Sequence, residues 1–322
     1  MKSVSMLSVW CQRLLSELEN ADGRAERLAR GLTREQFNWA PRPGAWSIGQ
    51  CLEHLRIGNE LARWRMNRRS AFLWLLIASV SPAAETGFLN RSVAVDGVDH
   101  RYVVYVPRDF NAATQWPMIL FLHGSGESGT DGLLQTELGL PRAIRRHQER
   151  FPAIVVMPQV DHGKWWSDDG VEKHALAALD ASAREFHGDP DRIYLTGLSL
   201  GGYGTWSIAA NNPGKFAALV PICGGIVRPV RGSQSAPEVA SADPYAEAAK
   251  KIGSTTPIWM FHGDADESVP VTESRKLLEA LKNIGANVRY TEYPGVQHNS
   301  WDLAYNNPEF PTWLFAQRLR KK

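Results

Sequence analysis

The segment that most constrains the fold of this chain spans residues 193–204 and reads IYLTGLSLGGYG. Its first half is an apolar run typical of a buried strand, and a segment of helical character follows. Between the two lies Ser199, flanked by Gly197 and Gly201. This spacing is typical of a sharp strand-to-helix turn that lifts a serine hydroxyl above a sheet. Glycine is needed there because a Cβ would crowd the adjacent strand and helix.

From about residue 90 onward, apolar runs alternate with segments of helical periodicity. Several runs are continuous, as expected for parallel strands that are covered on both faces. We predict strands at Arg101–Val106, Met118–His123, Ala153–Met157, Arg192–Thr196, Ala217–Ile222, Ile258–His262 and Val288–Tyr293. We predict helices at Val171–Phe186, Tyr203–Asn211 and Thr272–Ile284. This alternation indicates an α/β fold with helices on both faces of the sheet.

A serine hydroxyl is a weak nucleophile and needs a neighbouring base that is itself oriented by a carboxylate. The sixth predicted strand runs into an acidic loop that contains Asp264, Asp266 and Glu267, and the last is followed by a loop histidine, His298. Both loops come just after the carboxyl ends of strands, where open α/β sheets build their sites. We therefore predict a catalytic triad of Ser199, one carboxylate of this loop, and His298.

Two other histidines, His123 and His262, compete with His298 for the role of base. Each closes a predicted strand inside a His-Gly turn, which favours a role in supporting the loop backbone. Only His298 follows the acidic loop, as the chain order serine, acid, histidine requires.

A glycine-rich loop, HGSGESGTD, covers residues 123–131 at the end of the second predicted strand. Acyl transfer to a serine needs backbone donors for the oxyanion, and glycines let such a loop face the substrate. We predict one donor at the N–H of Leu200 and the other at the N–H of Ser125 or of Gly126. A phosphate-binding loop is disfavoured because Gly-Lys-Ser/Thr is absent.

The chain carries 36 Lys and Arg against 34 Asp and Glu, a net charge of +2, and has no long basic run. This balance does not favour nucleic-acid binding. Its three cysteines, Cys11, Cys51 and Cys223, lack metal-ligand spacing and are predicted to be buried thiols. The Asp and His residues at 161–169 form a poor ligand set, which predicts a solvated loop. We therefore predict no metal site.

Residues 66–87 begin with Met66 and two arginines, continue with an apolar run from Ala71 to Val80, and end in small residues. These are the zones of a secretory signal peptide, and the run is shorter than the about 20 residues of a membrane span. The alternative is a buried helix that links two domains. The signal-peptide interpretation is favoured because Pro82 and the following alanines supply a helix stop and a cleavage-like site. It predicts a secreted or periplasmic protein if translation starts at Met66.

The residues ahead of this segment have helical periodicity over 5–32, and Ser47–Gln50 looks like a capping box that opens a second helix. The stretch from Trp39 to Leu55 resembles the start of the DinB-like four-helix family, in which the histidine at the position of His54 is one of three metal ligands. About two of the four helices fit, and no partner histidine follows within them, so we expect no metal here. We expect a partial DinB-like helical segment at 1–65, a signal-like segment or linker at 66–87, and a catalytic domain at 88–322.

Three stretches together resemble a bacterial esterase group. They are the glycine-rich loop, residues 191–206 around Ser199, and residues 298–308, which read HNSWDLAYNNP. The group is the phospholipase/carboxylesterase and dienelactone-hydrolase-like set of α/β-hydrolases, often labelled predicted peptidases. The resemblance covers nearly all of residues 90–322. It implies an α/β-hydrolase fold with an eight-stranded, mostly parallel sheet and with no metal or organic cofactor.

In hydrolases of this kind the pattern His-Gly-x-x-Asp-x-x-Val-Pro places the triad acid at Asp266, which leaves Asp264 to shape the loop. The resemblance implies a serine carboxylesterase that hydrolyses short-chain or aryl esters through an acyl-enzyme. A feruloyl or acetyl esterase of plant polysaccharides is the alternative. A prolyl-oligopeptidase-like peptidase is disfavoured because no repeats of a gating propeller are visible.

Aromatic residues give the only hints about the substrate. Trp165 and Trp166 in a loop, and Trp301 beside the triad histidine, are predicted to line the pocket, whereas Trp206 is expected in the core. Residues 224–256 look like a short cap, too small for the lid of a long-chain lipase. The expected partner is a small-molecule or polysaccharide-linked ester, and the sequence leaves the oligomeric state open.

Overall fold

The computed structural model describes residues 85–168, 170–228 and 243–319. The chain divides into two compact units, Met1–Ala83 and Ala84–Lys322, and the described residues belong to the second. The predictions made for the helical segment 1–65, for His54 and for the apolar run that ends at Val80 lie outside the described residues. Among the described helices, none is long and apolar enough to cross a membrane.

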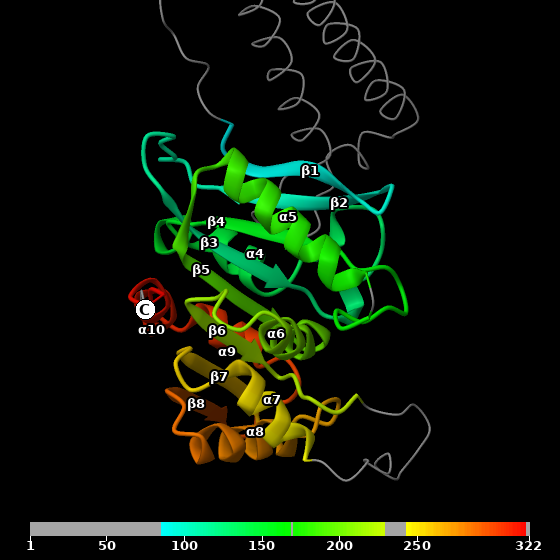
Figure 1. Ribbon diagram of the computed structural model, residues 1–322, viewed down its shortest axis with the longest axis vertical. Coiled ribbons are helices and arrows are strands. Elements are labelled where there is room, and N and C mark those ends of the chain that lie inside the picture. The colour runs from blue at the N-terminus through cyan, green and yellow to red at the C-terminus, as the bar shows by residue number, and fades with distance from the viewer. Residues whose placement is uncertain (1–84, 169, 229–242, 320–322) are drawn as a thin grey trace, which may run out of the picture. The chain divides into compact units, whose positions relative to one another are not determined.

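The second unit is built on an eight-stranded sheet (Figure 1). Its strands are β1 (Gly87–Val95), β2 (Val98–Val106), β3 (Trp116–Leu122), β4 (Ile154–Pro158), β5 (Gly188–Leu198), β6 (Ala218–Ile222), β7 (Ile258–Gly263) and β8 (Val288–Tyr293). Their order across the sheet is β1-β2-β4-β3-β5-β6-β7-β8. β2 pairs antiparallel with both β1 and β4, whereas every other pairing is parallel. The mostly parallel, eight-stranded sheet implied by the resemblance is confirmed.

Seven of these strands coincide with predicted strands, and β1 was missed. The reason is that β1 lies at the edge of the sheet and is only half-buried, so it has no continuous apolar run. A turn signal was nevertheless present. Asp96 and Gly97 both have positive φ, 50° and 82°, and join β1 to β2 as a hairpin.

Helices cover both faces of the sheet, as predicted (Figure 1). One face carries α5 (Val171–Glu185), α6 (Leu200–Asn211), α7 (Pro244–Ile252) and α8 (Thr272–Asn283). The other carries α4 (Leu140–Arg146), α9 (Trp301–Asn306) and α10 (Glu309–Phe315). Short 3₁₀ turns lie at η1 (Ser125–Glu127), η2 (Leu134–Thr136) and η3 (Gln148–Arg150). Each face therefore buries its own hydrophobic core.

The region expected to form a cap, residues 224–256, is in part a core helix. Within it, α7 packs against α6 and α8 and buries Tyr245, Ala249 and Ile252 in the hydrophobic core. Outside this helix, the structure describes residues 224–228, 243 and 253–256 of the region.

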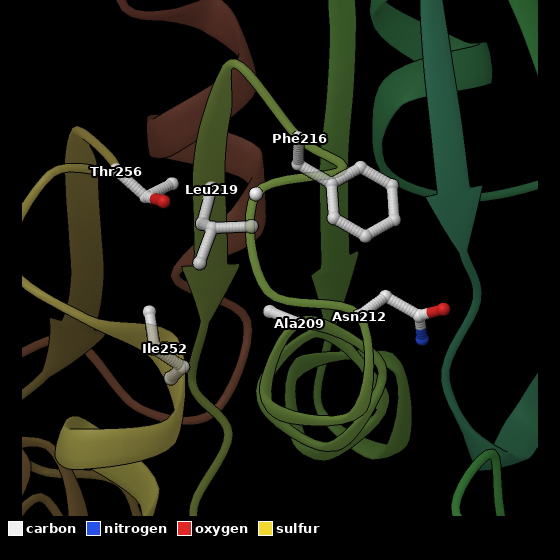
Figure 2. A pocket seen from close by; sticks show the side chains of 7 residues that line it. Ala209, Asn212, Phe216, Leu219, Ile252 and Thr256 are labelled. Carbon is white, nitrogen blue, oxygen red and sulfur yellow. The ribbon is translucent and has the colours of Figure 1, made fainter. Parts of the chain in front are cut away.

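The amino-terminal end of β6 is closed by tight packing (Figure 2). The residues around it come from the end of α6, the start of β6 and the end of α7; they are Ala209, Asn212, Gly214, Phe216, Leu219, Ile252 and Thr256. The space that they enclose has no room for a water molecule. The loops that hold the predicted site follow the carboxyl-terminal ends of the parallel strands, at the opposite end of β6.

Candidate active site

Ser199 lies at the sharp turn between the end of β5 and the start of α6. Its backbone has φ 52° and ψ −115°, a strained conformation for a residue with a side chain. A Cβ on Gly197 would lie 2.3 Å from the carbonyl oxygen of Gly201, and a Cβ on Gly201 would lie 2.0 Å from that of Leu122. The turn can therefore form only because both positions are glycine, which is the reason that the sequence predicted.

The structure brings Ser199, His298 and Asp266 together. His298 Nε2 lies 2.8 Å from Ser199 Oγ, and His298 Nδ1 lies 2.7 Å from Asp266 Oδ2. The Asp266 side chain is fully buried, whereas 24% of the His298 side chain is exposed. A buried carboxylate thus orients an imidazole whose other nitrogen faces an accessible hydroxyl. This is the geometry of an activated nucleophile.

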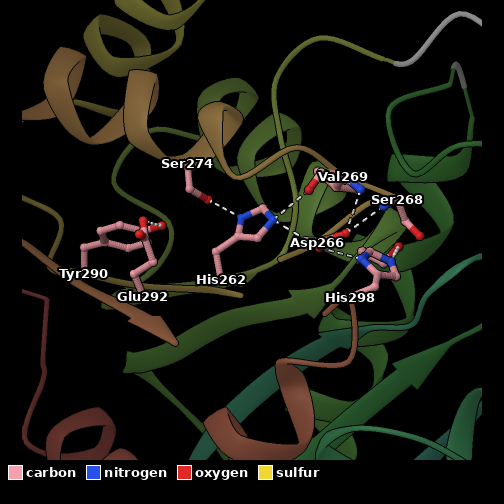
Figure 3. A network of polar contacts seen from close by, with 9 residues as sticks. His262, Asp266, Ser268, Val269, Ser274, Tyr290, Glu292 and His298 are labelled. Carbon is pink, nitrogen blue, oxygen red and sulfur yellow. Dashed lines mark hydrogen bonds and ion pairs between the residues drawn. The ribbon is translucent and has the colours of Figure 1, made fainter. Parts of the chain in front are cut away.

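Asp266 is held in a dense network of donors (Figure 3). Its Oδ1 accepts the backbone N–H groups of Ser268 and Val269, each at 2.9 Å, and its Oδ2 accepts from His298 and from His262. Burial alone would raise the pKa of Asp266, but the bonds from the two histidines and from Val269 outweigh burial and hold this pKa below the usual range. The carboxylate is therefore ionised near neutral pH.

The other two carboxylates of the acidic loop do not reach His298. Asp264 Oδ1 accepts the backbone N–H of Gly295 at 2.6 Å and so ties this loop to the loop that carries the histidine. Glu267 is exposed to solvent. Of the three carboxylates, Asp266 is therefore the one that contacts His298, whereas Asp264 bonds the backbone of the neighbouring loop.

His123 and His262 are both buried and bonded to loop atoms. His123 Nε2 accepts the N–H of Val160 at 3.0 Å, and its Nδ1 lies 2.6 Å from the carbonyl oxygen of Gly124. Burial lowers the pKa of His123 to about 4, so that the imidazole is neutral. These contacts fit the predicted loop support, and neither histidine contacts the serine.

The predicted oxyanion donors lie on the two segments that flank the serine. Leu200 is the first residue of α6, and Ser125 and Gly126 open η1. Amides at such positions have no acceptor within their own helix, so they are available to a ligand. A Cβ on Gly124 would lie 2.8 Å from Leu198 Cδ1, which shows that the glycine-rich loop packs directly on the serine turn.

Two polar side chains that sequence reasoning missed hold this loop in place. Glu127 Oε2 accepts the N–H of Gly124 at 3.0 Å. Gln159, at the end of β4, accepts the N–H of Gly132 at 2.7 Å and donates to the carbonyl oxygen of Glu127 at 3.0 Å and to Asp131 Oδ1 at 3.3 Å. Burial raises the pKa of Glu127, and its bond to Gly124 opposes this shift. The loop is therefore held by a bond within it, from Gly124 to Glu127, and by the bonds that Gln159 makes from the end of the neighbouring strand β4.

The three tryptophans predicted to contact substrate lie in different environments. Trp165 is half-buried and packs edge-on against Tyr203, with ring centroids 5.4 Å apart, and the guanidinium of Arg228 lies over it. Trp301 is half-buried and packs edge-on against His298 at 5.3 Å. Both have surface available to a ligand.

Trp166 does not fit its predicted role. Its side chain is fully buried, its indole N–H donates to the carbonyl oxygen of His123 at 3.1 Å, and its ring packs against the His123 ring. A side chain with no exposed surface supports the loop and cannot contact substrate. Trp206 is likewise in the core, as expected.

Among the described residues, one trio offers three atoms within 4.8 Å of one another that could ligate a metal ion: Cys223, Asp266 and His298. Two of these residues are bonded to each other in the serine network. Burial raises the pKa of the Cys223 thiol and keeps it protonated, which makes it a poor ligand.

Comparison with known proteins agrees with this geometry. Residues 146–305, which include all three members of the network, match the dienelactone hydrolase family. Residues 17–102 match the DinB superfamily, which confirms the resemblance of the N-terminal region, and the last of them overlap β1 and the start of β2.

Three similar proteins illustrate the match. The crystal structure of a thermostable esterase is 36% identical, with a TM-score of 0.60 over 72% of this chain and 63% of that one. Probable feruloyl esterase C of Aspergillus flavus is 24% identical over 74% of this chain and 84% of its own length. An uncharacterized secreted protein of Arthroderma benhamiae is 28% identical over 56% of this chain. The chain spans 21% of the secreted protein and under two thirds of the thermostable esterase. The sheet order and these matches together show that the chain has the α/β-hydrolase fold.

Proposed function

We propose that this chain is a serine carboxylesterase that hydrolyses short-chain or aryl carboxylic esters. The observation that carries the proposal is the continuous hydrogen-bonded path from Asp266 through His298 to Ser199, with contacts of 2.7 and 2.8 Å. The esterase names of the relatives support the same chemistry.

In the proposed mechanism, Ser199 Oγ attacks the ester carbonyl carbon while His298 Nε2 takes the hydroxyl proton. Asp266 stabilises the imidazolium that forms. The carbonyl oxygen becomes an oxyanion, which accepts hydrogen bonds from the N–H of Leu200 and from that of Ser125 or Gly126. His298 then returns the proton to the departing alcohol, and an acyl-enzyme remains. Water activated by the same histidine cleaves the acyl-enzyme and releases the carboxylic acid.

The first test compares two serines of the same edge of the sheet. Ser199→Ala removes the nucleophile and should abolish hydrolysis of p-nitrophenyl acetate and butyrate, as well as labelling by a fluorophosphonate. Ser125→Ala keeps the backbone N–H that the mechanism uses and should retain activity. Full hydrolysis by a folded Ser199→Ala variant would refute the mechanism. Because the mechanism uses no metal ion, chelators should not change the activity of the wild type.

A second candidate is a feruloyl or acetyl esterase of plant polysaccharides, acting outside the cell. The half-buried Trp165 beside Tyr203 favours an aromatic acyl group, and one relative is named a feruloyl esterase and another a secreted protein. Feruloyl and acetyl esters should be compared in the wild type and in Trp165→Ala. A selective rise in KM for the feruloyl ester would favour this candidate, and an equal effect on both esters would contradict it.

A further inference from the structure

A histidine outside the triad shares its carboxylate oxygen. His262 lies at the end of β7 and is fully buried, and its Nε2 lies 3.2 Å from Asp266 Oδ2. This is the oxygen that His298 Nδ1 contacts at 2.7 Å (Figure 3). One oxygen atom therefore joins two imidazoles, of which only His298 reaches the serine.

The surroundings of His262 determine which of its nitrogens carries the proton. Nε2 faces two acceptors, Asp266 Oδ2 and the carbonyl oxygen of Val269 at 3.0 Å, so it must be the N–H donor. Nδ1 lies 2.7 Å from Ser274 Oγ, a hydroxyl of α8 that can donate to it. A neutral His262 satisfies all these contacts, with its tautomer set by Ser274.

This arrangement has a consequence for Asp266. Its Oδ1 accepts two backbone N–H groups, and its Oδ2 accepts the N–H of His262 in addition to that of His298. The bond from His262 therefore helps to fix the rotation of the carboxylate about the Cβ–Cγ bond. A donor on Oδ2 also withdraws negative charge from the atom that contacts His298. We propose that His262 is a positioning residue, which holds Asp266 in the orientation and with the charge density that His298 requires. This inference rests on the proposed function.

Three titratable groups on the neighbouring elements are neutral or paired, and a fourth, Glu273 on α8, accepts hydrogen bonds from the N–H of Ile226 and the hydroxyl of Tyr245. The thiol of Cys223, after β6, and the phenol of Tyr203, on α6, both have a pKa raised by burial, so they carry no charge near neutral pH. Glu292, on β8, has a pKa lowered by its hydrogen bond from Arg275 on α8, and their charges offset each other at 2.6 Å. The acid limb of the pH–rate profile should therefore report on the coupled pair of Asp266 and His298.

The test measures kcat and KM against pH for p-nitrophenyl butyrate in four variants. His262→Leu removes the donor, and His262→Gln retains an N–H donor. Ser274→Ala removes only the hydroxyl that sets the tautomer. His174→Gln changes a buried histidine of α5 outside this network and serves as the matched control.

Removing the donor makes Asp266 Oδ2 more negative, so that protonated His298 is favoured and the acid limb moves to higher pH. We expect His262→Leu to shift the limb upward by about half a pH unit or more and to lower kcat roughly tenfold with KM little changed. Ser274→Ala should shift it less in the same direction, while His262→Gln and His174→Gln should keep the wild-type limb. If His262→Leu does not fold, the other two variants decide. An upward shift of the acid limb in Ser274→Ala but not in His262→Gln supports the proposal, and an unmoved limb in Ser274→Ala overturns it.

An unmoved limb in both His262→Leu and Ser274→Ala would overturn the positioning role, whatever the loss of stability. This outcome differs from a failure of the proposed function. In the latter case the wild type would not be labelled at Ser199 by a fluorophosphonate and would show no serine-dependent hydrolysis. A wild type that is labelled and active, with variants whose limb does not move, refutes this inference alone.

Discussion

His298 Nε2 lies 2.8 Å from Ser199 Oγ although 99 residues separate them in the chain. The sheet explains this proximity. Ser199 follows β5, Asp266 follows β7 and His298 follows β8, and these strands run parallel with only β6 between β5 and β7. Parallel strands present their carboxyl ends at one edge, so loops far apart in sequence meet there.

The assignment of the acid can be tested with two neighbouring aspartates. Asp266→Asn should lower kcat by roughly 10³- to 10⁴-fold, because an amide no longer holds His298 in the tautomer that accepts the serine proton. Steady-state kinetics with p-nitrophenyl butyrate measures the effect, and the thermal unfolding midpoint checks that the variant is folded.

Asp264→Asn is the matched control. Asp264 bonds the N–H of Gly295 and does not contact the base, so this variant should keep kcat within a few-fold while losing some stability. A large loss of kcat in Asp264→Asn with none in Asp266→Asn would reverse the assignment.

Gln159 should matter for turnover through the loop that it clamps. Gln159→Leu removes the bonds to Gly132, Glu127 and Asp131, which loosens the segment that carries the predicted oxyanion donors. Loss of an entire donor costs about 2.7–4 kcal/mol, and a loosened loop should cost less, so we expect kcat to fall about tenfold with KM little changed. A boronic acid that mimics the tetrahedral intermediate should bind more weakly in the same proportion.

The control is Gln135→Leu, since Gln135 is equally buried but makes one long hydrogen bond of 3.4 Å and leaves its side-chain oxygen unpartnered. Its kcat should be close to that of the wild type. Equal kcat in the two variants would mean that Gln159 acts on stability alone.

Sequence reasoning predicted those parts of the site that a short stretch of residues marks by its pattern. The turn at Ser199 is encoded by two glycines within five residues, and His298 by its place after the last strand. Apolar runs marked the buried strands for the same reason, because a strand covered on both faces needs them.

The parts that sequence reasoning missed depend on contacts between distant segments. Gln159 bonds atoms 27 to 32 residues away, and nothing in its own neighbourhood distinguishes it from an ordinary polar residue after a strand. Trp166 was predicted to line the pocket because it lies in a loop after a strand, yet its indole N–H donates to the carbonyl oxygen of His123 in the interior. Trp165 and Trp166 are adjacent on one loop, yet the first is half-buried and the second fully buried. Only tertiary packing determines this difference.

Stability should fall on acidification through two buried histidines. Burial lowers the pKa of both His123 and His174 from 6.5 to about 4. Below about pH 6.5 the unfolded chain binds these protons and the folded chain does not, so stability present above that pH is lost progressively down to about pH 4. Each histidine contributes about 3 kcal/mol to this loss.

The variant His174→Gln removes one of the two ionisations. Its free energy of unfolding, measured in urea, should fall about half as much between pH 7 and pH 4 as that of the wild type, apart from the losses that carboxylates cause in both proteins. Parallel curves for the two proteins across this range would contradict the prediction.

The close approach of Gly201 to β3 predicts a sharp difference between two glycines of the site. In Gly201→Ala, the new Cβ would lie 2.0 Å from the carbonyl oxygen of Leu122, a backbone atom that cannot move without displacing the central strand. The free energy of unfolding should fall by at least about 3 kcal/mol, beyond the usual cost of an overpacked core. In Gly126→Ala, the Cβ meets no atom within 4 Å and the N–H is retained, so stability should change little. Denaturant unfolding of both variants measures the contrast. Similar stabilities would show that the turn at Ser199 can relax, and that sterics do not require glycine at position 201.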